Sequence, residues 1–227
     1  MKLSRGLFAA AFVGAVAATV GTANAVTLDE LLTGAPDAMI VQGDRIYSKF
    51  TYLGTTIPAS AITITTPESG SGLRFTANPT WSTATGPNLT SVIGYTLSTN
   101  PGSGATISGV GLAFDATASG GGAAFVGETV YIGNSTRSLQ IFTDGDGGLQ
   151  DQLTDSITLD PAVTSLRVIK SIDVTAGSAG GSASIQFVDN TFVESGGENP
   201  PVIPEPATLA LLPLALAGLA LRRRAAR

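Results

Sequence analysis

RIYSKFTYL, residues 45–53, is the stretch of sequence that decides the fold class. Its side chains alternate in a period of two, which predicts Ile46 and Phe50 on one face of a strand and Tyr47 and Lys49 on the other. Successive side chains of a strand point to opposite faces, so this period is typical of a half-buried strand. We therefore expect an extended segment that turns one face toward a core.

The same period recurs along most of the chain that follows. The segments that show it are 61–65, 73–77, 91–98, 106–114, 124–132, 137–142, 156–159, 164–175 and 183–193. Clusters of Gly, Pro, Asn and Asp separate them at short intervals, as turns do between antiparallel strands. About ten strands of this kind predict a mainly β domain, an antiparallel β-sandwich of Greek-key or jelly-roll type.

One short helix is expected ahead of the first strand. Thr27 and Glu30 stand three residues apart, just before Leu31 and Leu32. This is the spacing of a capping box, in which each side chain accepts a hydrogen bond from the other residue's backbone amide. The sequence therefore predicts a single N-terminal helical turn in front of the β-sandwich.

The N-terminal segment has the three parts of a secretory signal peptide. Lys2 and Arg5 precede an apolar segment, residues 7–20, and the small residues Ala23 and Ala25 follow it. Small residues at this spacing are the recognition site of signal peptidase, so cleavage is expected after Ala25. The mature chain would then be an exported protein.

The C-terminal segment combines a turn-forming motif, an apolar run and a basic cluster. These parts are Pro204-Glu205-Pro206, the run 207–221, and Arg222, Arg223 and Arg224. A helix over the run would be roughly 22 Å long, short of the ~30 Å hydrocarbon core, which predicts a marginal, transient transmembrane helix. Arginines behind such a helix stay in the cytoplasm, so the preceding chain is predicted outside the inner membrane. The expected layout is a signal peptide at 1–25, a sandwich at 26–195, a linker at 196–203 and this segment at 204–227.

This C-terminal segment resembles the PEP-CTERM sorting signal of exported proteins in Gram-negative bacteria. The resemblance implies that Pro204, Glu205 and Pro206 form the motif read by exosortase, a membrane-embedded protease, and that Arg222 to Arg224 form the stop. It also implies a place at the cell surface or in the extracellular matrix, with a link to exopolysaccharide and biofilm. An ordinary membrane anchor is the alternative interpretation of the same residues.

Segments of the predicted sandwich also resemble a common kind of PEP-CTERM ectodomain. The resemblance covers 43–52, behind a short Leu-rich helix, and a late strand at 166–174. No activity is assigned to that kind of ectodomain. The resemblance therefore adds nothing to the prediction of a molecular task.

The composition of the chain argues against several function classes. All 17 acidic residues lie between Asp29 and Glu205, whereas half of the 12 basic residues lie in the two terminal segments. The acidic domain that results would repel phosphate backbones, so no nucleic-acid partner is expected. The chain has neither His nor Cys, which removes the usual zinc sites, most nucleophile–base pairs and any disulfide.

We therefore expect a protein that is not an enzyme. Paired carboxylates would be the remaining route to catalysis, as in glycoside hydrolysis. Asp115 and Glu128 could face each other across neighbouring strands, although solvated surface charges explain them equally well. No catalytic residue is predicted.

One loop has the character of a cation site. Asp144, Asp146, Asp151 and Asp155 repeat part of the spacing of a calcium loop, but Gly and Leu occupy two positions that the pattern requires for other residues. A plain Asp-Gly hairpin turn between strands at 137–142 and 156–159 explains the same residues. No metal cofactor is predicted, and these four aspartates stay the candidate Ca²⁺ ligands.

Trp81 is the one candidate for ligand binding. This only tryptophan lies between Asn-Pro and Gly-Pro turns, where an exposed ring would stack on a sugar and a buried ring would cap the sandwich core. The leading hypothesis is a non-enzymatic, exosortase-processed surface or matrix protein. A carbohydrate-binding or carbohydrate-cleaving domain is the alternative.

Overall fold

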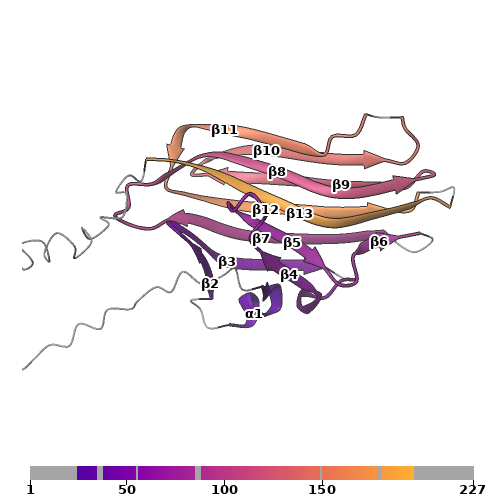
Figure 1. Ribbon diagram of the computed structural model, residues 1–227, viewed down its shortest axis with the longest axis horizontal. Helices are drawn as coiled ribbons and strands as arrows, with labels where there is room; N and C mark the ends of the chain where they lie inside the picture. The colour runs from indigo at the N-terminus through magenta and orange to yellow at the C-terminus, as the bar shows by residue number, and fades with distance from the viewer. Residues whose placement is uncertain are drawn as a thin grey trace, which may run out of the picture.

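The computed structural model is a two-layer antiparallel β-sandwich, described for residues 25–34, 38–54, 56–84, 88–148, 150–177 and 180–196. Figure 1 shows the strands of both layers running along the long axis of the molecule. All of the strand pairings are antiparallel. The predicted fold class is therefore confirmed.

The first sheet is built around the long strand β13. Its order is β1 (Val26–Thr27), β4 (Ile62–Thr65), β5 (Leu73–Ala77), β13 (Ser182–Ser195), β8 (Thr106–Ser119) and β11 (Thr154–Val163). The short strand β6 (Trp81–Thr83) also pairs with β13. β13 is thus hydrogen-bonded to strands on both of its sides.

The second sheet has β12 near its middle. Its order is β10 (Ser135–Asp144), β9 (Ala123–Ile132), β12 (Ser165–Thr175), β7 (Leu89–Thr99), β3 (Arg45–Gly54) and β2 (Met39–Gln42). From β7 onward the chain changes sheet at every connection except β9 to β10. The central strands β12 and β13 therefore follow each other in the chain but lie in opposite layers.

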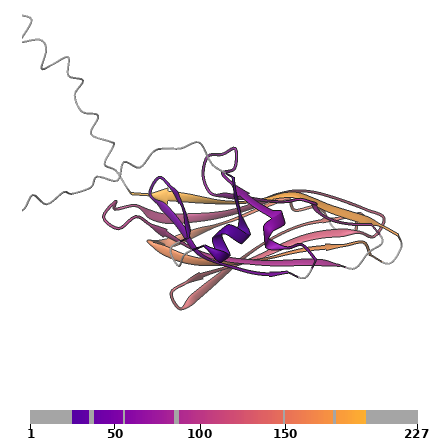
Figure 2. The same ribbon diagram turned by 90° about the horizontal axis from the view of Figure 1, so that it is seen from below.

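The predicted helix is present as α1 (Leu28–Thr33), and a 3-10 turn, η1 (Ala59–Ala61), follows later. The capping box forms as expected: the Glu30 amide donates to Thr27 Oγ1 over 3.3 Å, and the Thr27 amide donates to Glu30 Oε2 over 2.8 Å. α1 contacts β3 of one sheet and β4 of the other. It lies below the layers in Figure 1 and nearest the viewer in Figure 2.

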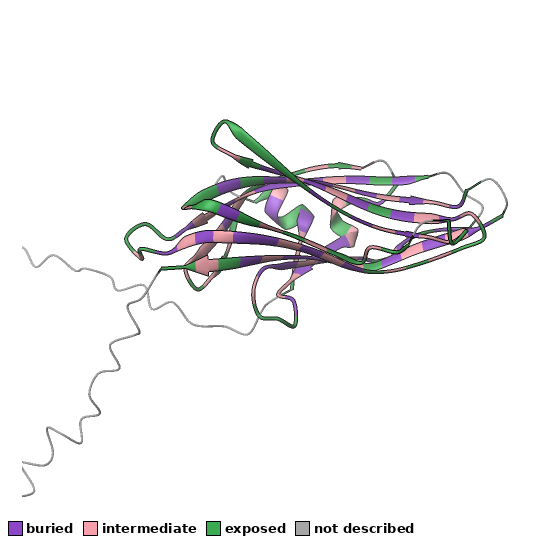
Figure 3. Cartoon of the chain, turned by 90° about the horizontal axis from the view of Figure 1, so that it is seen from above, coloured by how far each residue is buried: buried purple, intermediate pink, exposed green. Residues whose placement is uncertain are grey.

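The core lies between the sheets and is formed by the alternate side chains of the long strands. Figure 3 shows buried and exposed residues alternating along these strands, as the period of two predicts. The prediction for β3 was wrong in one respect: Tyr47 and Phe50 are both buried, whereas Ile46 is half-buried. Lys49 has a positive φ of 55° at a register shift, so a bulge reverses the phase of the strand there.

A second correction concerns the expected hairpin between 137–142 and 156–159. β10 and β11 lie in different sheets, and an isolated bridge joins Phe142 of β10 to Gln152, which precedes β11. The segment between them crosses from one layer to the other. Its Asp and Gly residues therefore form part of a crossover between sheets.

The predicted signal peptide and the C-terminal segment 204–227 lie outside the described residues, except for Ala25, which is exposed. Among the helices in the described ranges, none combines the length and apolar character needed to cross a membrane.

Candidate functional site

A cluster of polar side chains lies buried between the two sheets. It consists of Lys170 on β12, Glu128 on β9, Tyr95 on β7 and Asn190 on β13, and we call it the Lys170 cluster. The exposed fractions of these residues are 0%, 2%, 1% and 0%. Charged residues are almost never fully buried unless they are paired. These four residues therefore form the candidate functional site.

Strand register brings the members of the cluster together. Lys170 stands directly opposite Glu128 in the ladder between β12 and β9. Tyr95 lies on the other neighbour of β12, where its cross-strand partner is Val168. Asn190 comes from the opposite sheet, at the centre of β13. The cluster therefore connects the middles of both layers.

The polar atoms of the cluster satisfy one another. Lys170 Nζ donates to Glu128 Oε2 over 2.8 Å, and Asn190 Nδ2 donates to Glu128 Oε1 over 3.1 Å. Asn190 Nδ2 also donates to the Gly111 carbonyl over 3.0 Å, while Lys170 Nζ and the Tyr95 hydroxyl both donate to Asn190 Oδ1. The carboxylate of Glu128 thus accepts hydrogen bonds from both the Lys170 amine and the Asn190 carboxamide.

The surroundings of the cluster disfavour charge. Burial lowers the pKa of Lys170, and the nearby Glu128 carboxylate opposes that shift. The Lys170 amine lies 5.0 Å from the ring centre of Phe75 and 5.6 Å from that of Tyr95. Burial also raises the pKa of Tyr95 well above its ordinary value, so its hydroxyl stays a donor. The cluster therefore holds, beside a carboxamide, a lysine that loses its proton more readily than it would in water.

Sequence reasoning missed this cluster although its signal was present. Lys170 occupies the inward phase of β12, between the buried Val168 and Ile172. Glu128 and Asn190 occupy the corresponding inward positions of β9 and β13. A charged or amide side chain in an otherwise apolar phase is informative, because it needs a buried partner.

The suggested pairing of Asp115 with Glu128 is wrong. Asp115 is exposed on β8 of the first sheet, whereas Glu128 is buried on β9 of the second. The interpretation of Glu128 as a solvated surface charge is wrong for the same reason. Its carboxylate is instead committed to Lys170 and Asn190.

Three of the four candidate calcium ligands, Asp144, Asp151 and Asp155, accept hydrogen bonds from backbone amides. Asp144 Oδ1 accepts from the Asp146 amide over 3.1 Å, and Asp151 Oδ1 accepts from the Asp144 amide over 3.2 Å. Asp155 accepts from the Gln140 amide over 2.9 Å and from the Ser156 amide over 2.8 Å. Within the described ranges, no three acidic side chains are placed to hold a metal ion together.

Trp81 is part of the core. It is fully buried at the start of β6, and its indole N–H donates to Ser91 Oγ over 3.1 Å. The interpretation of Trp81 as an exposed ring that stacks on a sugar is therefore corrected. The core-capping alternative describes its position.

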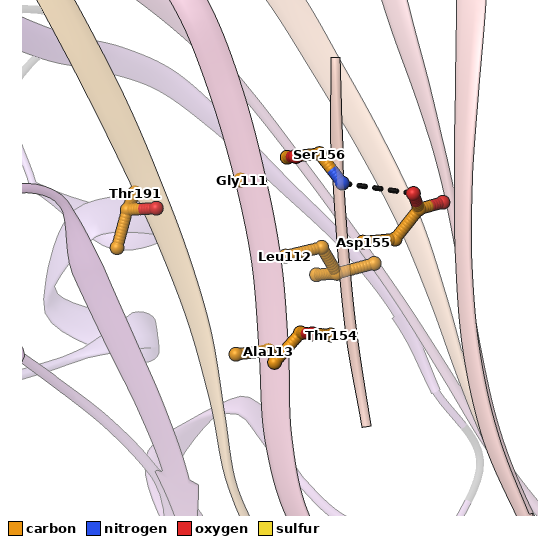
Figure 4. A pocket seen from close by; sticks show the side chains of 7 residues that line it. All are labelled: Gly111, Leu112, Ala113, Thr154, Asp155, Ser156 and Thr191. Atoms are coloured by element: carbon orange, nitrogen blue, oxygen red, sulfur yellow. Dashed lines mark hydrogen bonds between the residues drawn. The ribbon is translucent and has the colours of Figure 1, made fainter. Parts of the chain in front are cut away.

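A shallow depression of roughly 390 Å³ lies on the outside of the first sheet, between β8 and β11. Its lining residues are Gly111, Leu112, Ala113, Thr154, Asp155, Ser156 and Thr191 (Figure 4). Figure 4 shows the Asp155 carboxylate bound by the Ser156 amide. The depression offers hydroxyl groups and one carboxylate that is already hydrogen-bonded.

The outer face of the second sheet carries two exposed aromatic rings. Phe125 and Tyr131 lie on β9 and are each 38% exposed. The Arg167 guanidinium lies 5.9 Å from the ring centre of Tyr131. A Cβ added at Gly127 would come within 2.9 Å of Phe125 Cε1, so the Phe125 ring lies over this glycine. We call Phe125, Tyr131 and Arg167 the aromatic face.

Comparison with solved structures finds similarity at low sequence identity. A structure of TmCBM61 in complex with beta-1,4-galactotriose shares 14% identity, covers 64% of this chain and 90% of that chain, and has a TM-score of 0.36. The enzymatically active domain of bacteriophage CBA120 tailspike protein 4 shares 10% identity, covers 67% of this chain and 20% of that chain, and has a TM-score of 0.26. Comparison with curated protein sequences finds no match.

The C-terminal segment matches the model of a known protein-sorting motif. The PEP-CTERM protein-sorting motif matches residues 202–224, a range that includes Pro204, Glu205 and Pro206 and ends at Arg224. The resemblance inferred from the sequence is therefore confirmed for this segment. This motif indicates export and transient anchoring in the membrane before processing by exosortase. The chain is thus an exported protein that carries a PEP-CTERM sorting motif.

Proposed function

We propose that this chain is a non-enzymatic surface or extracellular-matrix protein, released from its membrane anchor by exosortase and associated with exopolysaccharide in a biofilm. The sorting motif at 202–224 supports this proposal, because it indicates export and transient anchoring in the membrane before processing. Signal peptidase would remove residues 1–25 on the same route.

The burial of the Lys170 cluster supports a structural task for the sandwich. Its four members are between 0% and 2% exposed, so an external substrate has no access to the amine or the carboxylate. An enzyme needs its reactive groups in contact with the substrate. The cluster therefore acts on the protein that contains it.

Intact-mass measurement of the protein from its native host tests the export route. The expected mature species lacks residues 1–25 and everything from about Pro204 onward. Replacing Pro204-Glu205-Pro206 by three alanines should leave an uncut, membrane-held form. A mature wild-type species that still contains 207–227 would contradict processing by exosortase and reduce the segment to an anchor.

The biofilm role needs a separate measurement. Deleting the gene should reduce the matrix or floc that the host forms, and the full-length gene should restore it. The alanine-replaced chain should not restore it, because that protein stays in the membrane. Unchanged matrix in the deletion strain would contradict the role while leaving the export route intact.

The aromatic face favours carbohydrate binding as a second candidate function. Exposed rings stack on the apolar faces of sugars, and a neighbouring Arg offers hydrogen-bond donors to hydroxyl groups. A glycan array with the mature protein tests this function, and a hydrolysis screen on the same glycans tests cleavage. Tyr131→Ala should abolish any signal, whereas Val193→Ala, at a 61% exposed position of the opposite sheet, should retain it. Equal signals from both variants would exclude the aromatic face as the binding surface.

A further inference from the structure

The Lys170 cluster places an amine against a carboxamide, with a carboxylate across both. Lys170 Nζ contacts Asn190 Oδ1, so the amine lies beside the carbonyl group that it would attack. Glu128 Oε2 is 2.8 Å from Lys170 Nζ, and Glu128 Oε1 is 3.1 Å from Asn190 Nδ2. A nucleophile, an electrophile and a proton carrier are thus held together by three strands of the two sheets.

We propose that the folded chain forms an isopeptide bond between Lys170 Nζ and Asn190 Cγ by itself, with release of ammonia. The lone pair of the deprotonated Nζ attacks Cγ, the C–N bond forms, and the carbonyl π electrons move to Oδ1. The carbonyl then reforms as the bond between Cγ and Nδ2 breaks. The reaction exchanges one amide nitrogen for another, so it needs no oxidant or reductant.

Glu128 carries the protons of this exchange. Its Oε2 accepts a proton from Lys170 Nζ before the attack, and its Oε1 delivers protons to Asn190 Nδ2. Two of the three protons of the lysine ammonium reach Nδ2 in this way, and the leaving nitrogen departs as ammonium. Glu128 ends as the carboxylate it was at the start.

The environment of Lys170 prepares the nucleophile. An ammonium group cannot attack, and a lysine becomes nucleophilic when an apolar site favours its neutral form. Burial lowers the pKa of Lys170, and the rings of Phe75 and Tyr95 lie close to its amine. The same burial excludes water, which would compete as a nucleophile.

Tyr95 and Gly111 orient and activate the carboxamide. The Tyr95 hydroxyl donates to Asn190 Oδ1, the atom on which negative charge develops during the attack. The Gly111 carbonyl accepts from Nδ2 over 3.0 Å and fixes the other end of the amide. Each polar atom of Asn190 therefore has a partner that suits the transfer.

The bond would supply a covalent tie that the sequence otherwise lacks. The chain contains no Cys, so no disulfide can stabilise this exported domain. Lys170 and Asn190 lie on interior strands of opposite sheets, and their link would join the two layers at the centre of the core. This proposal concerns the protein's own maturation and holds whatever the sandwich binds outside the cell.

Mass spectrometry of the full chain tests the proposal. Proteolytic cleavage after acidic residues, which does not occur before Pro161, separates Lys170, in peptide 156–173, from Asn190, in peptide 190–194. The expected product is one branched species of both peptides, lighter than their sum by about 17 Da, the mass of one ammonia. Trypsin should also fail to cleave after Lys170. This readout does not depend on how the termini are processed.

Three variants and a control separate the chemistry from the fold. Lys170→Ala and Glu128→Gln should yield the two separate peptides, and Tyr95→Phe should form the branched species more slowly, by roughly 10²-fold. Glu68→Gln, at an exposed carboxylate, should form it like the wild type. Wild-type protein that is folded by circular dichroism and still yields two separate, unmodified peptides would overturn the proposal without recourse to any variant.

Discussion

Replacing the buried Glu128 by glutamine should destabilise the protein strongly. The change keeps the size of the side chain but removes the carboxylate that pairs with Lys170 Nζ, at a site where Glu128 and Lys170 are 2% and 0% exposed. Removing one partner of a buried ion pair costs about 3–5 kcal/mol in the free energy of unfolding. In a domain of this size that loss lowers the melting temperature by roughly 6–20 °C. Loss of the isopeptide bond acts in the same direction.

Two further variants show whether the buried charge is the cause. Glu68→Gln makes the same chemical change at a carboxylate that is 93% exposed and 3.9 Å from Arg74. It should leave the urea midpoint unchanged, because exposed ion pairs contribute little. Adding Lys170→Met to Glu128→Gln removes the buried amine that has lost its partner, and it should recover the part of the lost stability that this amine costs, but not the part that the isopeptide bond supplies.

Urea unfolding followed by tryptophan fluorescence measures all of these variants, because Trp81 is buried in the core. The reasoning is refuted if Glu128→Gln unfolds at the wild-type midpoint with an unchanged slope. It is also refuted if the Lys170→Met addition makes the protein weaker still, since the buried charge would then not be the cause.

Three other predictions concern two buried tyrosines, a glycine beside β13 and the acidic loop. Burial raises the pKa values of Tyr47 and Tyr95, so these hydroxyls ionise at lower pH in the unfolded chain than in the folded one. The melting temperature should therefore fall as the pH rises above about 10. A melting temperature that stays constant from pH 9 to 11 would contradict this. Gly72→Ala should lower the free energy of unfolding by about 2–4 kcal/mol, because φ is 117° and a Cβ would lie 1.9 Å from a carbonyl oxygen of β13. Gly70→Ala, at φ 75° with open space around the Cβ, should lower it by less. Urea midpoints in the opposite order would contradict the packing argument. Calorimetry should detect no calcium binding below millimolar concentration, and a rise in melting temperature with calcium that Asp144→Ala removes would reverse that prediction.

The sandwich could be predicted from the sequence because its long strands repeat their apolar side chains over many residues. β7, β8, β9, β12 and β13 each extend over ten residues or more, which is enough for a period of two to stand out. β1 and β6 have two and three residues and were missed, since so few positions define no period, and the four-residue β2 was missed as well. Whether a long segment of this chain forms a strand can therefore be predicted from its local sequence.

Strand partners and faces were harder to predict because they depend on contacts distant in sequence. The positive φ of Lys49 reverses the phase of β3, and a lysine carries no sequence signal for that conformation. The crossover after β10 uses the same Asp and Gly residues as a hairpin turn would. The Lys170 cluster became recognisable only when the ladder placed Lys170 opposite Glu128 and the second layer added Asn190.

The position of β13 has a mechanical consequence for a protein held at its C-terminal end. The chain that leaves Ser195 leads to the sorting motif, so while that motif anchors the protein in the membrane, tension on the anchor would enter the sandwich along β13. β13 is bonded to β8 on one side and to β5 and β6 on the other, and a pull along its axis loads these hydrogen bonds together in shear. Asn190 stands five positions before the point of entry, so a covalent link there would pass the load to β12 before the rest of β13 could slide. The first sheet would thus bear the load on the anchored chain.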